Sequence, residues 1–298
     1  MERDFVGYGK NFPPVEWPEK ARIAVSIVVN YEEGSEYSLA FGDPTQEGYK
    51  EYPKLMPEGV RDLTNESVYE YGTRVGFWRI MRILKKYHIP ASFTACALAL
   101  ERNMETTKAI IEDGHEILSH GYRWEEQFKM TMEEEREFIK KAVESFKKTT
   151  GSHPEGWYCR YGPSVHTRRL LIEEGGFIYD SDSVADEIPY YVTVVGRPFL
   201  VVPYTIEVND MKFWTTGAFG NADDFFKYMK DTFDILYEEG VDHPKMMSVG
   251  LHLRVTGRPG RAKALEQFLD YTKYHKDVWF ARRVDIARWW LKHYPPKG

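Results

Sequence analysis

Three apolar runs of the sequence each end in side chains that can carry or exchange a proton. The first is followed by Glu32 and Glu33, the second by His120, and the third ends in His252. If these runs are parallel strands, their ends lie on one rim, where the catalytic groups of α/β barrels are found. Carboxylates and imidazoles are the groups of general acid–base chemistry, so the pattern predicts a hydrolytic site.

Glu32 and Glu33 are adjacent carboxylates, and we expect them to have different roles. Neighbouring residues of a strand point to opposite sides, so only one faces a given ligand. A carboxylate that is partly desolvated has a raised pKa and can act as a general base on water. The alternative interpretation is a solvated Glu-Glu-Gly turn on the surface.

His120 is a candidate metal ligand or acid–base group, and the alternative is a histidine that is hydrogen-bonded in the core. A metal site normally needs a second ligand on the same face, for instance four residues further on. Position 124 is Trp, which cannot ligate. The stretch 119–124 therefore predicts a metal motif that has lost one ligand, and we expect neither a metal nor another cofactor. If a metal binds, Glu33 and His120 are its candidate ligands.

His252 is a candidate general acid for a departing nitrogen. Asp180 and Asp182 follow another predicted strand, and either could orient a catalytic histidine, although an Asx turn explains them equally well. Arg160 precedes a turn and could stabilise either a carbonyl oxyanion or the first carboxylate. A planar ligand would need flat walls, although aromatic residues are more often core. The candidates for such walls are Trp124, Trp157, Tyr158 and Trp214.

Strand-like and helix-like segments alternate along the chain with short joints. The expected strands are 22–30, 91–97, 116–119, 156–159, 177–180, 199–203, 246–252 and 278–281. The expected helices are 73–87, 104–113, 132–150, 167–174, 221–239, 261–274 and 285–293. This alternation predicts an α/β fold with a parallel sheet and enough units to close into a barrel.

The domain organisation is expected to be simple. With 298 residues, no linker and no internal repeat, we expect one catalytic domain over residues 1–298. Residues 1–20 contain several prolines and are expected to form an extended leader. Residues 34–72 show little periodicity, and a loop of this length is expected at an active site or an interface.

Charge, hydropathy and cysteine spacing limit the classes of partner and the cellular locations that we expect for the protein. The net charge of −6 with no basic block argues against nucleic acid as the main partner. No stretch is apolar enough to span a membrane, and we see no secretory signal, so a cytoplasmic protein is expected. The spacing of Cys96 and Cys159 favours reduced core thiols.

These motifs resemble the polysaccharide-deacetylase (NodB-homology) superfamily, and within it the metal-independent allantoinase and cyclic-imide hydrolase branch. Residues 30–34 sit where deacetylases carry Thr-Phe-Asp-Asp-Gly, and 119–124 sit on the His-x-x-x-His metal motif. Longer stretches resemble the allantoinases specifically, and the resemblance spans nearly the whole chain. These allantoinase-like stretches are 69–72, 119–124, 173–177, 179–182, 202–205, 208–211, 280–283 and 285–288.

The resemblance implies a distorted (β/α)7 barrel, often assembled as a homotetramer. It also implies roles for Glu32, Glu33 and His252. Glu32 takes the position of the family's base and Glu33 that of its metal ligand, here expected to contact substrate. His252 takes the position of the general acid. The implied activity is hydrolysis of a C–N bond in a small cyclic amide, most directly the ring opening of allantoin to allantoate.

One departure leaves the substrate open. Allantoinases have Thr-Gly-Arg after Gly-Trp-Tyr and one residue fewer, whereas this chain has the longer loop 159–166. A cyclic-imide hydrolase is therefore the nearest alternative. A metal-dependent polysaccharide N-deacetylase is a second alternative, and a binding protein on a decayed deacetylase scaffold is a third.

Overall fold

The computed structural model describes residues 3–49, 56–215 and 218–296. Its strands form one sheet with the order β6-β7-β5-β4-β3-β2-β1-β8, and β9 pairs with the start of β1. The strands are β1 (Ile23–Tyr31), β2 (Ala91–Ala95), β3 (Glu116–Ser119), β4 (Gly156–Trp157), β5 (Tyr179–Asp180), β6 (Tyr190–Val194), β7 (Arg197–Val201), β8 (Lys245–His252) and β9 (Val278–Phe280).

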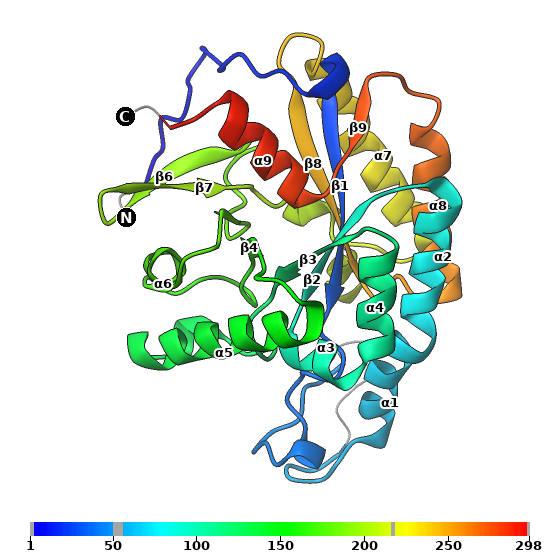
Figure 1. The fold of residues 1–298 in the computed structure, drawn as a ribbon. Helices are drawn as coiled ribbons and strands as arrows, with labels where there is room; N and C mark the ends of the chain where they lie inside the picture. The colour runs from blue at the N-terminus through cyan, green and yellow to red at the C-terminus, as the bar shows by residue number, and fades with distance from the viewer. Residues whose placement is uncertain (1–2, 50–55, 216–217, 297–298) are drawn as a thin grey trace.

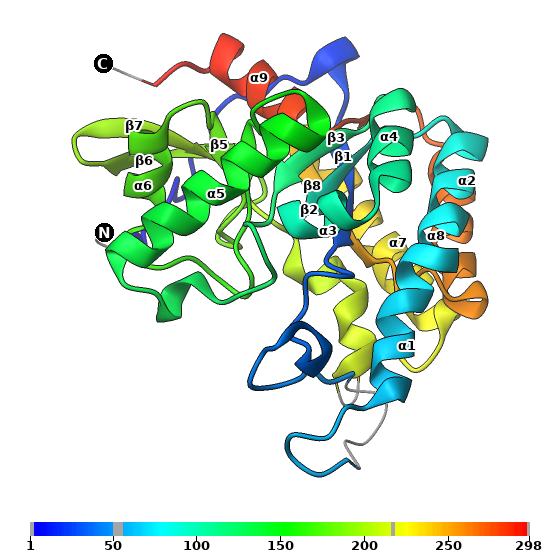
Figure 2. The same cartoon turned by 60° about the horizontal axis from the view of Figure 1, so that its bottom comes forward.

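Helices flank the sheet (Figures 1 and 2). They are α1 (Leu63–Tyr71), α2 (Phe77–Tyr87), α3 (Ala97–Arg102), α4 (Met104–Glu112), α5 (Met132–Thr150), α6 (Thr167–Glu174), α7 (Ala222–Glu239), α8 (Pro259–Thr272) and α9 (Arg283–His293). Helices α7, α8 and α2 pack in sequence beside the β1–β8 end of the sheet, and α5 packs against α6 beside the other half. None of the helices in the described ranges is long and apolar enough to cross a membrane.

The sheet is curled like a half-barrel, which confirms the predicted distorted barrel. All pairings are parallel except the β6–β7 hairpin, where β6 turns back along β7. In the described part of the chain no ladder joins β6 to β8, so the barrel does not close. The sequence did not predict β6, because its residues do not form a buried apolar run: three are half-buried, one is exposed and only the last is buried.

The central strand follows directly from its sequence. Every residue of β1 is buried, as expected for a strand that is covered on both faces. Its first residues pair with β9 on one edge, its last residues pair with β2, and β8 runs along the other edge. Before the start of β1, Trp17 packs between Trp279 of β9 and Trp290 of α9.

The stretch 34–72, expected as a loop, is partly helical. Asp62 caps α1 by accepting hydrogen bonds from the backbone N–H groups of Thr64 and Asn65. A single π-helical turn, Gly72–Gly76, joins α1 to α2. Positions 50–55 of this stretch lie outside the described residues.

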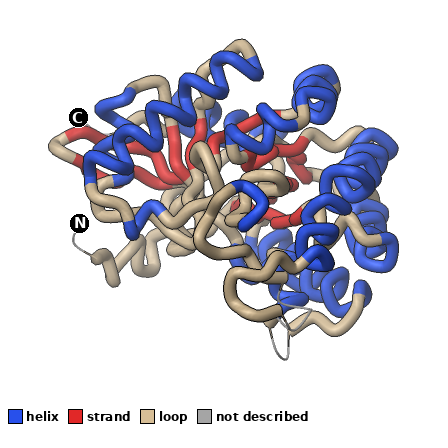
Figure 3. Tube along the Cα trace, turned by 90° about the horizontal axis from the view of Figure 1, so that it is seen from below, coloured by secondary structure: helices blue, strands red, loops and turns tan. Residues whose placement is uncertain are grey.

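Gly72, in the π-helical turn between α1 and α2, lies so close to the side chain of Glu33 that a larger residue does not fit there. A Cβ at this position would lie 2.6 Å from Oε1 of Glu33, closer than real Cβ contacts come. The π-helical turn can therefore pack directly on the end of β1. Figure 3 looks onto this side of the molecule, where loops cover the centre and helices surround them.

Candidate active site

The sheet register brings the three predicted strand ends together. Asn30 is paired with His252, and the next residue of β1, Tyr31, is paired with Ala95 of β2. The backbone N–H of His120 donates to the carbonyl of Ala95 at 2.8 Å. Glu32, His120 and His252 therefore lie at the same level, at the ends of β1, β3 and β8, with β2 between β1 and β3.

Glu32 lies between the two histidines. Its Oε1 is 3.5 Å from Nε2 of His120 and 3.5 Å from Nε2 of His252. The three side chains are almost fully buried. Electrostatic interactions between them are stronger here than they would be in water.

Arg254, which the sequence analysis did not assign, binds both glutamates. Its guanidinium lies 2.7 Å from Oε2 of Glu32 and 3.1 Å from Oε1 of Glu33. Burial alone would raise the pKa of Glu32, but the charges of Arg254 and His252, with hydrogen bonds between the carboxylate and the two histidines, together outweigh burial and hold that pKa well below its usual range. Glu32 is therefore held as a carboxylate.

Glu33 was expected to contact substrate, but it does not line the cavity that opens onto Glu32 and the two histidines. Its Oε1 accepts from the backbone N–H and the guanidinium of Arg254, and its Oε2 accepts from the backbone N–H of Glu32. Burial raises the pKa of Glu33 despite the opposing charge of Arg254. Glu33 therefore positions Arg254, and the hollow that it lines is not the one that opens onto Glu32 and the histidines.

The prediction that Asp180 or Asp182 orients His252 was wrong, because Asp210 does so. Oδ1 of Asp210 lies 2.6 Å from Nδ1 of His252, and its Oδ2 accepts from the backbone N–H of the same histidine at 2.8 Å. Asp210 begins the short 3-10 helix Asp210–Trp214, which packs on β8. Burial lowers the pKa of His252, but Glu32 and Asp210 outweigh it and raise that pKa to about 9.

The other two aspartates are occupied elsewhere. Arg168 donates to Asp180 at 2.7 Å, and the backbone N–H of Cys159 donates to Asp182 at 2.8 Å. Burial, together with the neighbouring Asp180 carboxylate, raises the pKa of Asp182 to about 7. Asp180 therefore holds Arg168 of α6 and Asp182 holds the start of the 159–166 loop, and neither orients the histidine.

His120 has a fixed ring orientation. Its Nδ1 lies 2.6 Å from the carbonyl oxygen of Tyr158, which can only accept, so Nδ1 carries a hydrogen. In the neutral imidazole, the free lone pair is then on Nε2, which faces Glu32. The ring also stacks on Tyr158, with the two planes 9° apart.

A cavity of about 400 Å³ opens onto these groups. Glu32, His120, His252 and Arg254 line it together with an aromatic wall and several polar side chains. The other lining residues are Asn30, Glu47, Gly48, Tyr49, Tyr69, Trp124, Tyr158, Cys159, Arg160, Tyr161, Ile206, Asn209, Met211, Trp214 and Thr215.

Three of the four predicted wall residues, Trp124, Tyr158 and Trp214, line this cavity, and Trp157 does not. Trp157 is fully buried, packs edge-on against Phe177 and directs its Nε1 to the sulfur of Cys159. Because alternate residues of a strand face opposite sides, Tyr158 reaches the cavity and its neighbour Trp157 faces the core.

Arg160 lines the cavity but is not bonded to the Glu32–histidine cluster. Its guanidinium donates to the carbonyl of Trp124 at 2.6 Å and to Glu47 at 2.7 Å. It also stacks over the Trp124 ring, 3.8 Å from the ring centroid. The structure therefore places the positive charge nearest to Glu32 on Arg254, and Arg160 in the wall.

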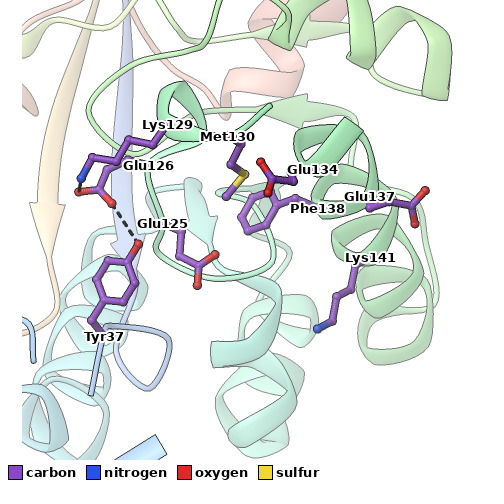
Figure 4. Close-up of a pocket in the computed structure, with 9 residues that line it drawn as sticks. All are labelled: Tyr37, Glu125, Glu126, Lys129, Met130, Glu134, Glu137, Phe138 and Lys141. Carbon is purple, nitrogen blue, oxygen red and sulfur yellow. Dashed lines mark hydrogen bonds and ion pairs between the residues drawn. The ribbon is translucent and has the colours of Figure 1, made fainter. Parts of the chain in front are cut away.

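A second hollow, of about 480 Å³, lies on the outer surface beside α5 (Figure 4). It is lined mainly by glutamates and lysines, and Glu126 is bonded there to Tyr37 and Lys129. No histidine lines this hollow. The cluster of Glu32, His120 and His252 therefore lies in the cavity of about 400 Å³ and not in this outer hollow.

Comparison with known proteins agrees with this arrangement. The family model for polysaccharide deacetylase matches residues 64–178. A Schizosaccharomyces pombe protein provisionally named polysaccharide deacetylase is 40% identical over 99% of both chains. The chain belongs to the polysaccharide deacetylase family.

Solved structures of this family superpose closely on the chain. The crystal structure of Puue allantoinase is 46% identical, with a TM-score of 0.95 over 100% of this chain and 99% of that one. A Pseudomonas aeruginosa protein, provisionally named polysaccharide deacetylase, is also 46% identical, with a TM-score of 0.94 over both full chains. Among relatives found by sequence alone, the Helicobacter pylori peptidoglycan deacetylase is 27% identical over 76% of this chain and 87% of its own.

The residues present do not fit the metal motif of the family. Trp124 stands at the place of the second histidine, and its indole has no free lone pair to offer. Glu33, at the place of a carboxylate ligand, is bound to Arg254. Across residues 3–49, 56–215 and 218–296, no group of three or more His, Cys, Asp or Glu side chains is arranged to hold a metal.

Proposed function

We propose that this member of the polysaccharide deacetylase family is a metal-independent hydrolase that opens the ring of a small cyclic amide. Allantoin, opened to allantoate, is the first candidate substrate. The observation that carries the proposal is the placement of Glu32 Oε1 between His120 and His252, with Arg254 on its other oxygen. The similarity to Puue allantoinase over the whole chain supports the choice of substrate.

In the proposed reaction, a water molecule on the cavity side contacts both Glu32 and His120, whose facing atoms are 3.5 Å apart. Both Oε1 of Glu32 and the lone pair on Nε2 of His120 can accept a hydrogen bond from this water. As the water oxygen bonds to the amide carbon, its proton passes to the Glu32–His120 pair. Arg254 keeps Glu32 ionised, so the negative charge that polarises the water is present before substrate binds.

His252 supplies the second proton. With a pKa of about 9 it is an imidazolium at neutral pH, and its charge stabilises the oxyanion that forms on the attacked carbonyl. It then protonates the departing ring nitrogen as the C–N bond breaks, and the ring opens to a carboxylic acid and a free N–H group. The acid releases its proton to solvent and becomes the carboxylate. The proton on the Glu32–His120 pair returns to His252.

A cyclic-imide hydrolase is the second candidate, and the loop 159–166 favours it. Cys159, Arg160 and Tyr161 of this loop line the cavity, so the extra residue that separates this loop from the allantoinase pattern acts on the shape of the site. A polysaccharide N-deacetylase is the third candidate, supported by the names of two relatives.

The test is a substrate panel with the purified protein. Racemic allantoin, hydantoin, succinimide and an N-acetylglucosamine oligomer are incubated separately, and products are identified by mass spectrometry. We expect allantoin to gain one water and yield allantoate. Opening of succinimide without opening of allantoin would move the assignment to a cyclic-imide hydrolase. Acetate release from the oligomer without any ring opening would move it to a deacetylase.

The expected homotetramer and the expected cytoplasmic location stay predictions. Size-exclusion chromatography with light scattering tests the first, and fractionation of cells that produce the protein tests the second.

A further inference from the structure

One ion pair in the wall of the active cavity is not used by the proposed chemistry. Oε2 of Glu47 lies 2.7 Å from Nη2 of Arg160, and both side chains line the cavity. No hydrogen bond or ion pair in the described chain connects either of them to Glu32, His120 or His252. The pair is therefore a second polar feature of the same cavity.

The guanidinium of Arg160 is held firmly in place. It donates to the carbonyl of Trp124, stacks on the ring of Trp124 and contacts the hydroxyl of Tyr161 at 3.2 Å. Arg160 is only 3% exposed, and its Nε has no hydrogen-bond partner among the described residues. A buried donor without a partner is costly. Of the five N–H groups of the guanidinium, the bonds to Trp124, Glu47 and Tyr161 use three, which leaves donor capacity for a ligand in the cavity.

Glu47 comes from a different part of the chain. It lies on the segment that follows β1, and its neighbours Gly48 and Tyr49 also line the cavity. The bond to Arg160 uses only Oε2, and a carboxylate offers about four acceptor sites in all. Glu47 can therefore accept from a ligand while it remains paired with Arg160.

An ionised carboxylate only accepts hydrogen bonds, and a guanidinium only donates them. Side by side, the two match the edge of a neutral amide or urea, in which a carbonyl lies next to an N–H. A charged ligand group is disfavoured, because the pair already neutralises its own charges. We infer that Glu47 and Arg160 bind a second amide or ureido group of the substrate, outside the ring that is opened.

This inference rests on the proposed function and deepens it. In a bare ring such as succinimide or hydantoin, every carbonyl and N–H belongs to the ring itself, which must face Glu32 and the histidines to be opened. A ring that carries a ureido arm has a second edge for the Glu47–Arg160 pair. The pair therefore selects ureido-substituted rings, such as allantoin, over the bare hydantoin ring.

The experiment measures kcat/KM for allantoin and for hydantoin in the wild-type protein and in Glu47→Ala. Losing hydrogen bonds to a charged group is expected to lower kcat/KM for allantoin by about 10- to 100-fold. We expect the value for hydantoin to stay within about threefold, because hydantoin has no arm. Glu47→Gln keeps an acceptor oxygen and is expected to recover part of the loss.

Glu126→Ala is the matched control. Glu126 lies 4.0 Å from the same guanidinium nitrogen of Arg160, but it belongs to the outer hollow and is bonded to Tyr37 and Lys129 (Figure 4). We expect this variant to keep the wild-type ratio of the two kcat/KM values. The ratio separates recognition from folding, because a damaged fold lowers both values together.

Three outcomes would overturn the inference: equal loss for both substrates in Glu47→Ala, no loss for allantoin, or equal kcat/KM for the two substrates in the wild type. If the wild type opens neither ring, the proposed function fails separately. Calorimetric titration of allantoin then decides about Glu47. Weaker binding by Glu47→Ala than by the wild type would support a ureido-binding pair, and equal or absent binding would refute it.

Discussion

The carboxylate of Glu32 is bound to the guanidinium of Arg254 at 2.7 Å, and both side chains are buried. The two residues are 222 positions apart in the chain. Arg254 also binds Glu33, so a single cation serves both adjacent carboxylates. The account of the site depends on this fixed charge, since it keeps Glu32 ionised in a cavity where burial alone would protonate it.

Replacing Arg254 by Met is expected to be costly for the fold. It leaves two buried carboxylates without their cation, which typically destabilises a protein by about 3–5 kcal/mol. It also raises the pKa of Glu32, because burial is no longer opposed, so any residual activity requires higher pH. Urea denaturation and a pH–rate profile measure the two effects.

Arg254→Lys is the matched control, since it keeps the charge but loses the two-pronged geometry. We expect it to be more stable than Arg254→Met and less active than the wild type. If Arg254→Met were as stable as the wild type, or if its acidic limb did not move to higher pH, the assigned role of Arg254 would be wrong.

Removing the charge of Asp210 is expected to shift the pH dependence of catalysis. Asp210 raises the pKa of His252, so Asp210→Asn lowers it, and the alkaline limb of kcat/KM moves down by about one unit or more. Asp182→Asn is the comparison, because Asp182 does not contact His252. An alkaline limb that moves with Asp182→Asn and stays in place with Asp210→Asn would restore the original prediction for Asp182.

The raised pKa of His252 also makes stability depend on pH. The group has a pKa of about 9 in the folded protein and 6.5 as its ordinary value. Its contribution is therefore fully present below about pH 6.5 and is lost as the pH rises through 9. The size is roughly 3 kcal/mol.

His252→Gln lacks the titrating group and provides the reference for this effect. We expect the free energy of unfolding of the wild type to fall more steeply than that of His252→Gln between pH 7 and pH 10. Parallel curves would show that His252 is not held as an imidazolium.

Gly72→Ala tests the close contact between the π-helical turn and Glu33. The added Cβ would overlap the Glu33 carboxylate, and overpacking of this kind costs about 1–3 kcal/mol. Gly260→Ala in α8 is the control, because no atom lies within 4 Å of its added Cβ. Equal unfolding midpoints for the two variants would contradict the described packing.

The sequence was most informative where a strand is buried on both faces. The apolar runs of β1, β3 and β8 predicted these strands and the polar residues at their ends, because a short, continuous apolar run is typical of a strand that is buried on both faces. The hairpin strand β6 and the helices α1 and α3 were missed. Helix α3 closely follows β2 and has only six residues, which is too short a segment to show a helical periodicity in the sequence.

The site was predicted in part, for a related reason. Glu32, His120 and His252 mark strand ends, which local sequence reveals. Asp210 and Arg254 were missed as partners, because Asp210 follows no predicted strand and meets His252 only through packing of a short 3-10 helix. A similarity to the allantoinases was visible at 208–211, and that was the available signal.

The most direct test of the central claim is the opening of allantoin by protein that has been treated with chelator and freed of metal. The account predicts full kcat without added metal, no gain on addition of zinc, and a loss of about 100-fold or more in Glu32→Gln. Activity that is absent after chelation and restored by zinc would contradict the claim that Arg254, rather than a metal, supplies the fixed positive charge beside Glu32.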